Sequence, residues 1–292
     1  MIHKMDRLPE TCLWPACVKT QPFDRQLDAA VAGGFDAIAV GGLTHDALKS
    51  QGMTGADIRA LTEGKGVRLG HYDGFTDWAP VRFDDSIPPL AQSVFDFSTE
   101  AVLAICADLG LHSVGATGAY RPGRFSVNEL ADGFAAFCEQ ADRVGLWVDL
   151  EFIPFWGIPD LPAAWDIVEA SGARNAGVLL DTWHFCRGNA DLEYLRNLPT
   201  HAISAVQVAG GLTPSSGMSL IDECLTLRTA PGHGDLDITA VLGLLARQET
   251  IRSIGPEVFS DALDAEPAES VGKQMAEGLS YALEIMGRSH GD

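Results

Sequence analysis

Short apolar runs alternate along this chain with longer segments whose apolar residues recur at helical spacing. The segment Phe23–Ala32 has the helical spacing, and after Gly34 the run Ala37–Val40 is continuously apolar, which is typical of a strand buried on both faces. The same unit recurs along the chain. Eight strands are expected, at Thr11–Trp14, Ala37–Val40, Val67–His71, Ser113–Gly115, Leu146–Phe152, Gly177–Asp181, Ile203–Val208 and Ser253–Phe259.

Amphipathic segments lie between these strands and are clearest at Glu100–Leu109, Val127–Val144 and Ile238–Arg247. Because strand and helix alternate, the strands should run parallel, and eight such units predict an α/β fold of the (β/α)8 TIM-barrel type. A final helix is expected at about Ser270–Met286. No Ser/Gly-rich linker interrupts the sequence, so residues 1–292 are expected to form one TIM-barrel domain.

Two segments fit this pattern less well. Asp191–Leu198 gives barely two helical turns, and Gly210–Leu227 is a long polar connection after the seventh strand. The active sites of barrel enzymes are built from the loops at the carboxyl ends of the strands. We therefore expect Gly210–Leu227 to cover the substrate.

Four successive strands end in polar residues, which are costly to bury unless they are used. These residues are Glu151, Asp181, Gln207 and Glu257. Any one of them could be a capping or salt-bridged residue, but the carboxyl ends of barrel strands converge, so the four together predict a site for one divalent cation. Three carboxylates and an amide oxygen are hard donors, so Mn2+ is the first choice, with Mg2+, Co2+ and Zn2+ as the alternatives.

Three segments resemble the signature segments of the xylose isomerase-like TIM barrel superfamily and, within it, of the sugar phosphate isomerase/epimerase family. They are Asp181-Thr182-Trp183-His184-Phe185, Arg228 with Pro231-Gly232-His233-Gly234-Asp235-Leu236-Asp237, and Gly255-Pro256-Glu257-Val258-Phe259. The resemblance covers nearly the whole chain and implies that the four strand-end residues ligate the metal. It also implies that His184 contacts the substrate or the metal, and that Arg228 holds a substrate hydroxyl, phosphate or carboxylate.

Two further residues are candidates for substrate binding. Trp183 lies inside a signature segment, and aromatic rings pack against sugar faces. His71 ends the third strand, where a barrel site would use it as a substrate contact, although a hydrogen-bonded structural role is the alternative. His45 and His112 are expected in loops without a paired ligand.

A cation held by these ligands would polarise a substrate carbonyl and stabilise an enediolate, while Glu151 or Glu257 removes the adjacent proton. Return of the proton to the other face inverts a carbon centre, so the resemblance implies an isomerase or epimerase acting on a keto-sugar or related hydroxyketone. Loss of a β-hydroxyl would instead give dehydration. The sugar epimerases usually carry His at the position of Gln207, whereas the related 3-dehydroshikimate dehydratases can carry Gln, so a metal-dependent lyase is the alternative.

Composition bears on the other classes of function. The chain has 40 acidic and 20 basic residues and a formal net charge of −20, which would repel nucleic acid. The apurinic-site endonuclease branch of the superfamily would need more metal-binding histidines and a basic face. A barrel that only binds a ligand would not need all four metal ligands.

Cysteine usage and hydropathy give an expected location. Six cysteines without a CxxC pair are expected to be reduced thiols in a cytoplasmic protein. No apolar run reaches the ~20 residues that span a bilayer. The expected partner is a small polyhydroxy ketone, with no nucleic acid and no membrane, and a homo-oligomer is left open.

Overall fold

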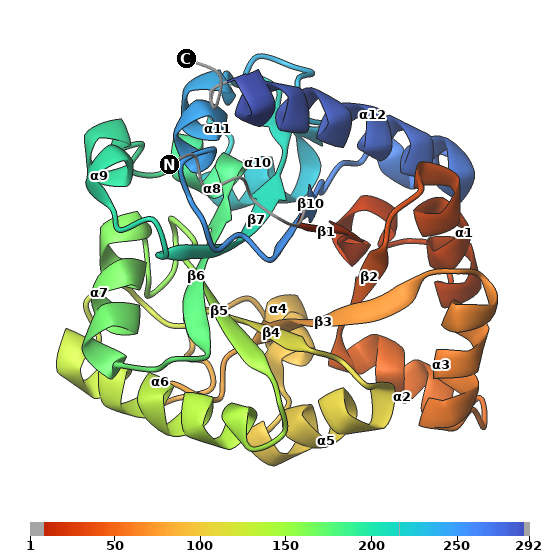
Figure 1. Ribbon diagram of the computed structural model, residues 1–292, viewed down its shortest axis with the longest axis horizontal. Coiled ribbons are helices and arrows are strands. Elements are labelled where there is room, and N and C mark those ends of the chain that lie inside the picture. Colours follow the sequence, from red (N-terminus) through yellow and green to blue (C-terminus); the bar gives the residue numbers. More distant parts are fainter. Residues whose placement is uncertain (1–8, 216, 289–292) are drawn as a thin grey trace, which may run out of the picture.

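The computed structural model describes residues 9–215 and 217–288. Eight parallel strands close into a barrel in the order β1-β10-β7-β6-β5-β4-β3-β2 (Figure 1). They are β1 (Glu10–Leu13), β2 (Ala37–Val40), β3 (Arg68–Phe75), β4 (Ser113–Ala116), β5 (Trp147–Glu151), β6 (Ala176–Asp181), β7 (Ile203–Val208) and β10 (Ser253–Pro256). Each of them overlaps an expected strand, so the predicted (β/α)8 TIM barrel is confirmed.

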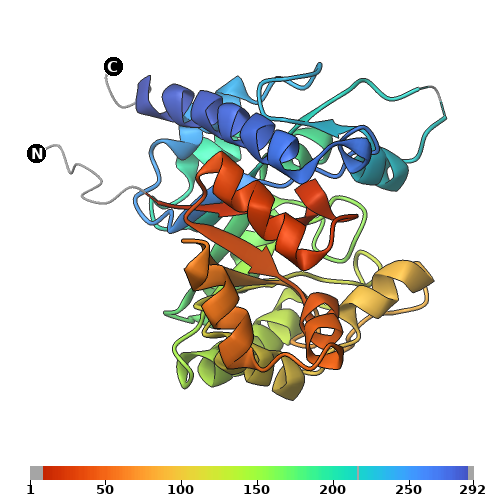
Figure 2. The same cartoon turned by 90° about the vertical axis from the view of Figure 1, so that its right-hand side faces the viewer.

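Helices surround the barrel on its outer face (Figures 1 and 2). The α-helices are α1 (Phe23–Gly33), α2 (Gly42–Ser50), α3 (Gly55–Gly64), α4 (Pro89–Phe95), α5 (Thr99–Leu109), α6 (Val127–Asp142), α7 (Leu161–Ser171), α8 (Thr182–Arg187), α9 (Leu192–Asn197), α10 (Leu220–Thr226), α11 (Thr239–Leu245) and α12 (Ala268–Arg288). Short 3-10 helices lie at η1 (Pro15–Val18) and η2 (Leu263–Ala265). In the described part of the chain no single helix is long and apolar enough to cross a bilayer, and α4 and α5 meet the criterion only as a pair bent by 60°.

The last helix, α12, packs along the first, α1, on the outside of the barrel (Figure 2). The two backbones approach closely at Gly272, where a Cβ would lie 2.0 Å from the carbonyl oxygen of Ala29. Any side chain at this position would therefore force the helices apart. Beneath this contact β1 pairs with β2 on one side and with β10 on the other, so the first and last units close the barrel together.

Capping signals in the sequence fix the ends of several helices. Helix α6 begins with a capping box, in which the Ser126 hydroxyl accepts the Glu129 N–H and the Glu129 carboxylate accepts the Ser126 N–H. Helix α1 ends at Gly33 and is capped by Gly34, whose φ of 70° lies in the left-handed region that favours glycine. Both helices begin at the residues predicted for them.

Small and hydroxyl-bearing residues fill the middle of the barrel. Ser113 and Ser204 both donate hydrogen bonds to the buried carboxylate of Asp149, which lies at the centre of β5. A Cβ at Gly177 would lie 2.3 Å from the Ser204 hydroxyl, so no larger residue fits at this level. This polar layer separates the carboxyl ends of the strands from their amino ends.

Strand β3 is longer than the sequence suggests. The expected strand ends at His71, two residues before Asp73. In the structure the strand continues to Phe75 and pairs with β4 in the register Asp73 to Gly115. The correction brings Asp73 to the same end of the barrel as the four strand-end residues.

The polar connection Gly210–Leu227 also contains regular structure. Its first two residues form β8 (Gly210–Gly211), which pairs antiparallel with β9 (Arg228–Thr229), and α10 lies near its end. This small sheet holds Arg228 next to the barrel. That the connection covers a substrate remains a prediction.

Candidate active site and metal centre

The four predicted ligand residues lie together at the carboxyl ends of neighbouring strands. Glu151 and Asp181 are the last residues of β5 and β6, Gln207 is in β7, and Glu257 directly follows β10. Gln207 is in register with Asp181 on one side and with Gly255 on the other. All four side chains are buried, although Glu151 and Glu257 keep a little exposed surface. The site predicted from strand ends is therefore assembled in space, and metal binding by it remains to be measured.

Gln207 leaves one polar atom without a partner. Its Nε2 donates to Glu257 Oε1 at 3.1 Å, whereas its buried Oε1 accepts no hydrogen bond from any described residue. A buried acceptor left unpaired costs about 1–3 kcal/mol. A cation bound by this oxygen would remove that cost, so the amide fits a metal ligand.

Arg228 orients two of the carboxylates. Its Nη1 donates to Asp181 Oδ2 at 2.6 Å and lies 3.4 Å from Glu257 Oε2. The guanidinium carbon lies over the ring of Trp183 at 4.9 Å and over that of Phe259 at 5.4 Å. Arg228 is fully buried, and its donors point at protein groups. Its contact with substrate remains a prediction.

Asp181 connects the strand end to His184. Its Oδ1 caps α8 by accepting the N–H groups of Trp183 at 2.6 Å and His184 at 3.0 Å. The His184 ring then lies with Nε2 at 3.5 Å from Glu151 Oε1 and 3.3 Å from Arg228 Nη2. Burial, assisted by the charge of Arg228 and opposed by Asp181, lowers the pKa of His184 to about 3, so the imidazole is neutral.

Negative charge exceeds positive charge in this cluster. Burial raises the pKa of Glu151 well above its ordinary value, and the charges of Asp181 and Asp73 add to the effect. Burial together with the charges of Glu151 and Asp73 does the same for Glu257. Four carboxylates face one guanidinium, so their full ionisation requires further positive charge. Ligand atoms of Glu151, Asp181 and His184 lie within 4.8 Å of one another, a spacing that a single cation could span.

Asp73 is a site residue that the sequence analysis missed. Its charge acts on both Glu151 and Glu257, and burial raises the pKa of Asp73 to about 6. The available signal was its position two residues after His71, which puts the two side chains on one face of an extended strand. Ending the strand at His71 concealed this signal.

The remaining predicted substrate contacts lie in different surroundings. Trp183 is fully buried beneath Arg228, so its ring is covered by protein in this structure. His71 contacts Glu10 at 3.2 Å and stacks on Trp14 with ring centroids 5.5 Å apart. The structure thus groups His71 with the amino end of β1 rather than with the four strand-end residues, and substrate binding by either ring remains a prediction.

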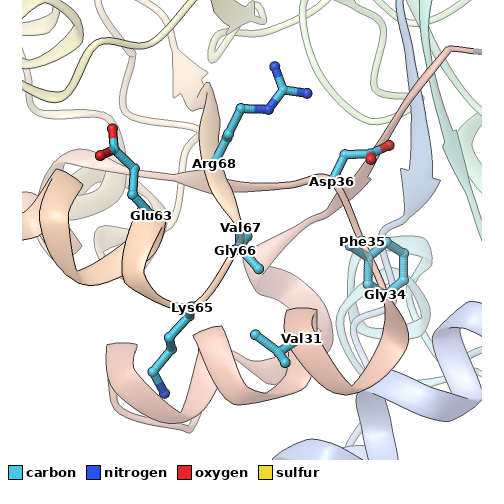
Figure 3. A pocket seen from close by; sticks show the side chains of 9 residues that line it. All are labelled: Val31, Gly34, Phe35, Asp36, Glu63, Lys65, Gly66, Val67 and Arg68. Atoms are coloured by element: carbon cyan, nitrogen blue, oxygen red, sulfur yellow. The ribbon is translucent and has the colours of Figure 1, made fainter.

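Hollows also lie outside the group of four strand-end residues. One of about 490 Å3 lies between the ends of α1 and α3 and is lined by Val31, Gly34, Phe35, Asp36, Glu63, Lys65, Gly66, Val67 and Arg68 (Figure 3). Three of its charged side chains already have partners: Asp36 with Thr11, Lys65 with Asp28, and Arg68 with Glu10. Another, of about 80 Å3, lies beside Trp183 and Arg187 near the strand ends.

Comparison with known proteins identifies relatives along most of the chain. Residues 27–283 match the sequence model of the xylose isomerase-like TIM barrel family. A 3-dehydroshikimate dehydratase of Pseudomonas aeruginosa is 25% identical over 272 residues, which are 91% of this chain and 40% of that protein. A protein of the same name from Pseudomonas putida is 23% identical over 265 residues, which are 88% of this chain and 39% of that protein. The chain thus spans about 40% of the length of these relatives.

Solved structures share the fold at lower identity. A xylose isomerase-like TIM barrel/4-hydroxyphenylpyruvate dioxygenase fusion protein matches with a TM-score of 0.79 and 19% identity, over 95% of this chain and 43% of that chain. The IolI protein, whose structure holds a zinc atom, matches with a TM-score of 0.78 and 16% identity, over 96% of this chain and 98% of that chain. An L-ribulose 3-epimerase matches with a TM-score of 0.68 and 17% identity, over 96% of each chain. This chain belongs to the xylose isomerase-like TIM barrel family.

Proposed function

We propose that this chain is a divalent-metal-dependent lyase that removes a proton from the carbon next to a carbonyl of a cyclic polyhydroxy ketone and then eliminates water. The observation that carries the proposal is the buried oxygen cluster of Glu151, Asp181, Gln207 and Glu257, in which the negative charge exceeds what Arg228 supplies. These ligands are all hard donors and suit Mn2+ or Mg2+.

The chain's own residues would divide the work of proton transfer. A bound divalent ion would polarise the substrate carbonyl and lower the cost of the negative charge that develops there. Glu151 or Glu257, in its carboxylate form, would accept the proton from the adjacent carbon. Arg228 fixes Asp181 and Glu257, and the Gln207 amide holds Glu257 from the other side.

Elimination needs a second proton transfer. The β-hydroxyl leaves as water once it has received a proton from an acid in the site, and the electron pair of the broken C–H bond forms the new double bond. Glu151 and His184 lie 3.5 Å apart and are the candidates for this acid. The neutral imidazole can relay a proton without a change in the charge of the resting site.

Two observations favour dehydration over the epimerisation expected first. Gln207 stands where sugar epimerases usually carry His and where 3-dehydroshikimate dehydratases can carry Gln. In addition, both relatives compared above by sequence are 3-dehydroshikimate dehydratases. A six-membered hydroxyketone that becomes aromatic on loss of water is therefore the proposed substrate class.

Epimerisation of a ketose is the second candidate. It is supported by the two glutamates, one at the end of β5 and the other directly after β10, since one could remove a proton and the other return it. The likeness to L-ribulose 3-epimerase covers the whole barrel. A panel of ketoses tests this candidate.

The deciding experiment offers the Mn2+-loaded protein 3-dehydroshikimate and, separately, a panel of ketoses. Dehydration is followed by the ultraviolet absorbance of the aromatic product, and epimerisation by chromatography. Glu257→Gln should lower dehydration by at least ~100-fold. Glu139→Gln, on the exposed face of α6, is the matched control and should retain full activity.

The outcomes separate the candidates. Ketose turnover without dehydration would replace the lyase by the epimerase. Absence of turnover on every substrate, with metal fully bound, would refute both.

A further inference from the structure

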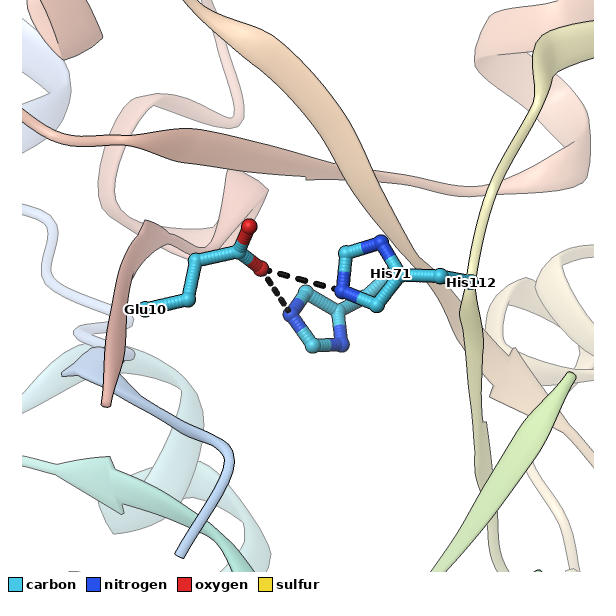
Figure 4. A group of neighbouring side chains, drawn as sticks. All are labelled: Glu10, His71 and His112. Atoms are coloured by element: carbon cyan, nitrogen blue, oxygen red, sulfur yellow. Dashed lines mark hydrogen bonds and ion pairs between the residues drawn. The ribbon is translucent and has the colours of Figure 1, made fainter. Parts of the chain in front are cut away.

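A second group of metal-ligating side chains lies at the amino ends of the strands, beyond the Asp149 layer. Glu10 is the first residue of β1, His71 is in β3 at the level of the first residue of β4, and His112 directly precedes β4. Figure 4 shows the Glu10 carboxylate directed at both imidazole rings. His112 was expected in a loop without a partner, and the structure corrects this expectation.

The spacing from the Glu10 carboxylate to the two imidazole rings is close to that of a tetrahedral metal site. Glu10 Oε2 lies 3.2 Å from His71 Nε2 and 3.1 Å from His112 Nε2. One ligand atom from each of the three residues lies within 4.8 Å of the others. Zinc bonds of about 2.0–2.1 Å in tetrahedral geometry separate neighbouring ligand atoms by about 3.4 Å. The two contacts of Glu10 are therefore within a few tenths of an ångström of the spacing around a bound zinc ion.

The surroundings fix the orientation of the ligands. The His71 ring stacks on Trp14, and Glu10 Oε1 is held by Arg68 at 2.7 Å, so Oε2 is left to face the two rings. Gly70 keeps the space open, because a Cβ there would lie 3.2 Å from Glu10 Oε2. The His112 side chain is 39% exposed, which gives solvent access and an open fourth position.

The charged groups around these side chains are shared between the two carboxylate oxygens. Glu10 supplies one negative charge, with Arg68 on its Oε1 and the two imidazole rings on its Oε2. A divalent ion bound between Oε2 and the two rings would replace hydrogen at the ligating nitrogens, because a histidine ligates a metal through a deprotonated ring nitrogen.

We propose that Glu10, His71 and His112 form a second divalent-metal site, selective for Zn2+, that stabilises the amino end of the barrel. Two imidazoles and one carboxylate suit zinc, whereas the oxygen ligands at the opposite end suit Mn2+ or Mg2+. In the barrel, β2 separates β1 from β3, so the ion would link strands that share no hydrogen bonds. Residues at this end of a TIM barrel serve stability rather than catalysis.

The test loads the full chain with zinc alone, removes unbound ions by gel filtration and measures zinc by elemental analysis. We expect about two zinc ions per wild-type chain and about one in His112→Ala. The matched control is His201→Ala, which removes an exposed histidine at the same end of the barrel, two residues before β7. It should retain both ions.

A second measurement separates this site from the catalytic one. Zinc should raise the thermal midpoint of wild-type protein and of His201→Ala more than that of His112→Ala, because binding to the folded state stabilises it. Glu10→Gln should behave as His112→Ala, so misfolding of one variant leaves the other as a test. One zinc per wild-type chain, lost only in Glu257→Gln, would overturn the proposal. Equal zinc content and equal zinc-dependent midpoints in His112→Ala and His201→Ala would do the same.

Discussion

Arg228 Nη1 lies 2.6 Å from Asp181 Oδ2, and neither side chain has any exposed surface. The same guanidinium nitrogen is 3.4 Å from Glu257 Oε2. When one partner of such a pair is removed, the other charge remains buried without compensation. The geometry of the site and the stability of the barrel therefore depend on the same contact.

Replacement of Arg228 tests this dependence. Arg228→Met should lower the free energy of unfolding of the metal-free protein by about 3–5 kcal/mol, because Asp181 would be left buried without a counter-ion. Urea unfolding followed by circular dichroism measures the change. Arg143→Met, which removes an exposed pair with Glu139, is the control and should change little. Equal stability of Arg228→Met and wild type would show that the buried pair makes no net contribution.

Metal content tests the four strand-end residues. After loading with Mn2+ the wild-type chain should retain about one ion, since a single set of oxygen ligands can enclose only one. Glu257→Gln should weaken this binding, because a neutral amide replaces a charged ligand. Elemental analysis of the folded protein measures the Mn2+ content per chain. Folded wild-type protein that binds no Mn2+ would disprove the site.

Gln207 should set the preference between metals. Gln207→His replaces an amide oxygen by an imidazole nitrogen, which should raise the affinity for Zn2+ relative to Mn2+. Competition titration of the two ions measures the ratio of their affinities. Gln248→His is the control, because Gln248 is buried at the other end of β7, where its side chain accepts the Ile203 N–H. An unchanged ratio in Gln207→His would place Gln207 outside the coordination shell.

Solvent deuterium reports on proton removal. If Glu151 or Glu257 takes a proton from carbon, then substrate recovered from heavy water before full conversion should carry deuterium at that carbon whenever the base exchanges with solvent. Glu151→Gln and Glu257→Gln should each suppress this incorporation. His184→Ala should lower the rate of turnover less than either of these changes. Mass spectrometry measures the label. Near-normal turnover in both glutamine variants with full metal would move the search for the base to Asp73 and His184.

Asp84 should contribute to the pH dependence of stability. Burial raises its pKa, but hydrogen bonds from Ser86, the Arg121 N–H and Arg124 outweigh burial and hold the pKa below its usual range. The folded-state pKa is therefore below the unfolded value of about 3.9, so the stabilisation is present above that pH and is lost as pH falls through the folded-state pKa.

The matching variant is Asp84→Asn. It should be less stable than wild type at neutral pH, and its free energy of unfolding should fall less steeply as the solution is acidified from about pH 5 to pH 2. Urea unfolding across this range measures both curves. Asp85→Asn, which alters a neighbouring carboxylate with 83% exposure, is the control. Parallel curves for Asp84→Asn and wild type would contradict the assignment.

The strands and the four strand-end residues could be predicted from sequence because their signals are local. An apolar run followed by one polar residue marks both the strand and its carboxyl end, and barrel geometry then brings those ends together. Glu151 and Asp181 were found in this way. The segments that resemble the xylose isomerase-like family include Asp181 and Glu257, and the resemblance implies the same four ligand positions.

The residues that were missed lack such a local signal. Asp73 lies beyond the expected end of its strand at His71, and the extension of β3 depends on pairing with β4. Glu10 begins β1 and His112 directly precedes β4, and both histidines reach the Glu10 carboxylate only because the barrel closes. Only tertiary structure brings Glu10, His71 and His112 together.

The contact of Gly272 with Ala29 has a consequence for synthesis on the ribosome. The first helix leaves the exit tunnel long before its covering helix has been made, and at ~5–20 residues per second the delay is on the order of tens of seconds. Strand β1 likewise waits for β10, its neighbour on one side. This barrel can therefore close only after the residues as far as α12 have left the ribosome, and until then β1 has no neighbour on its β10 side.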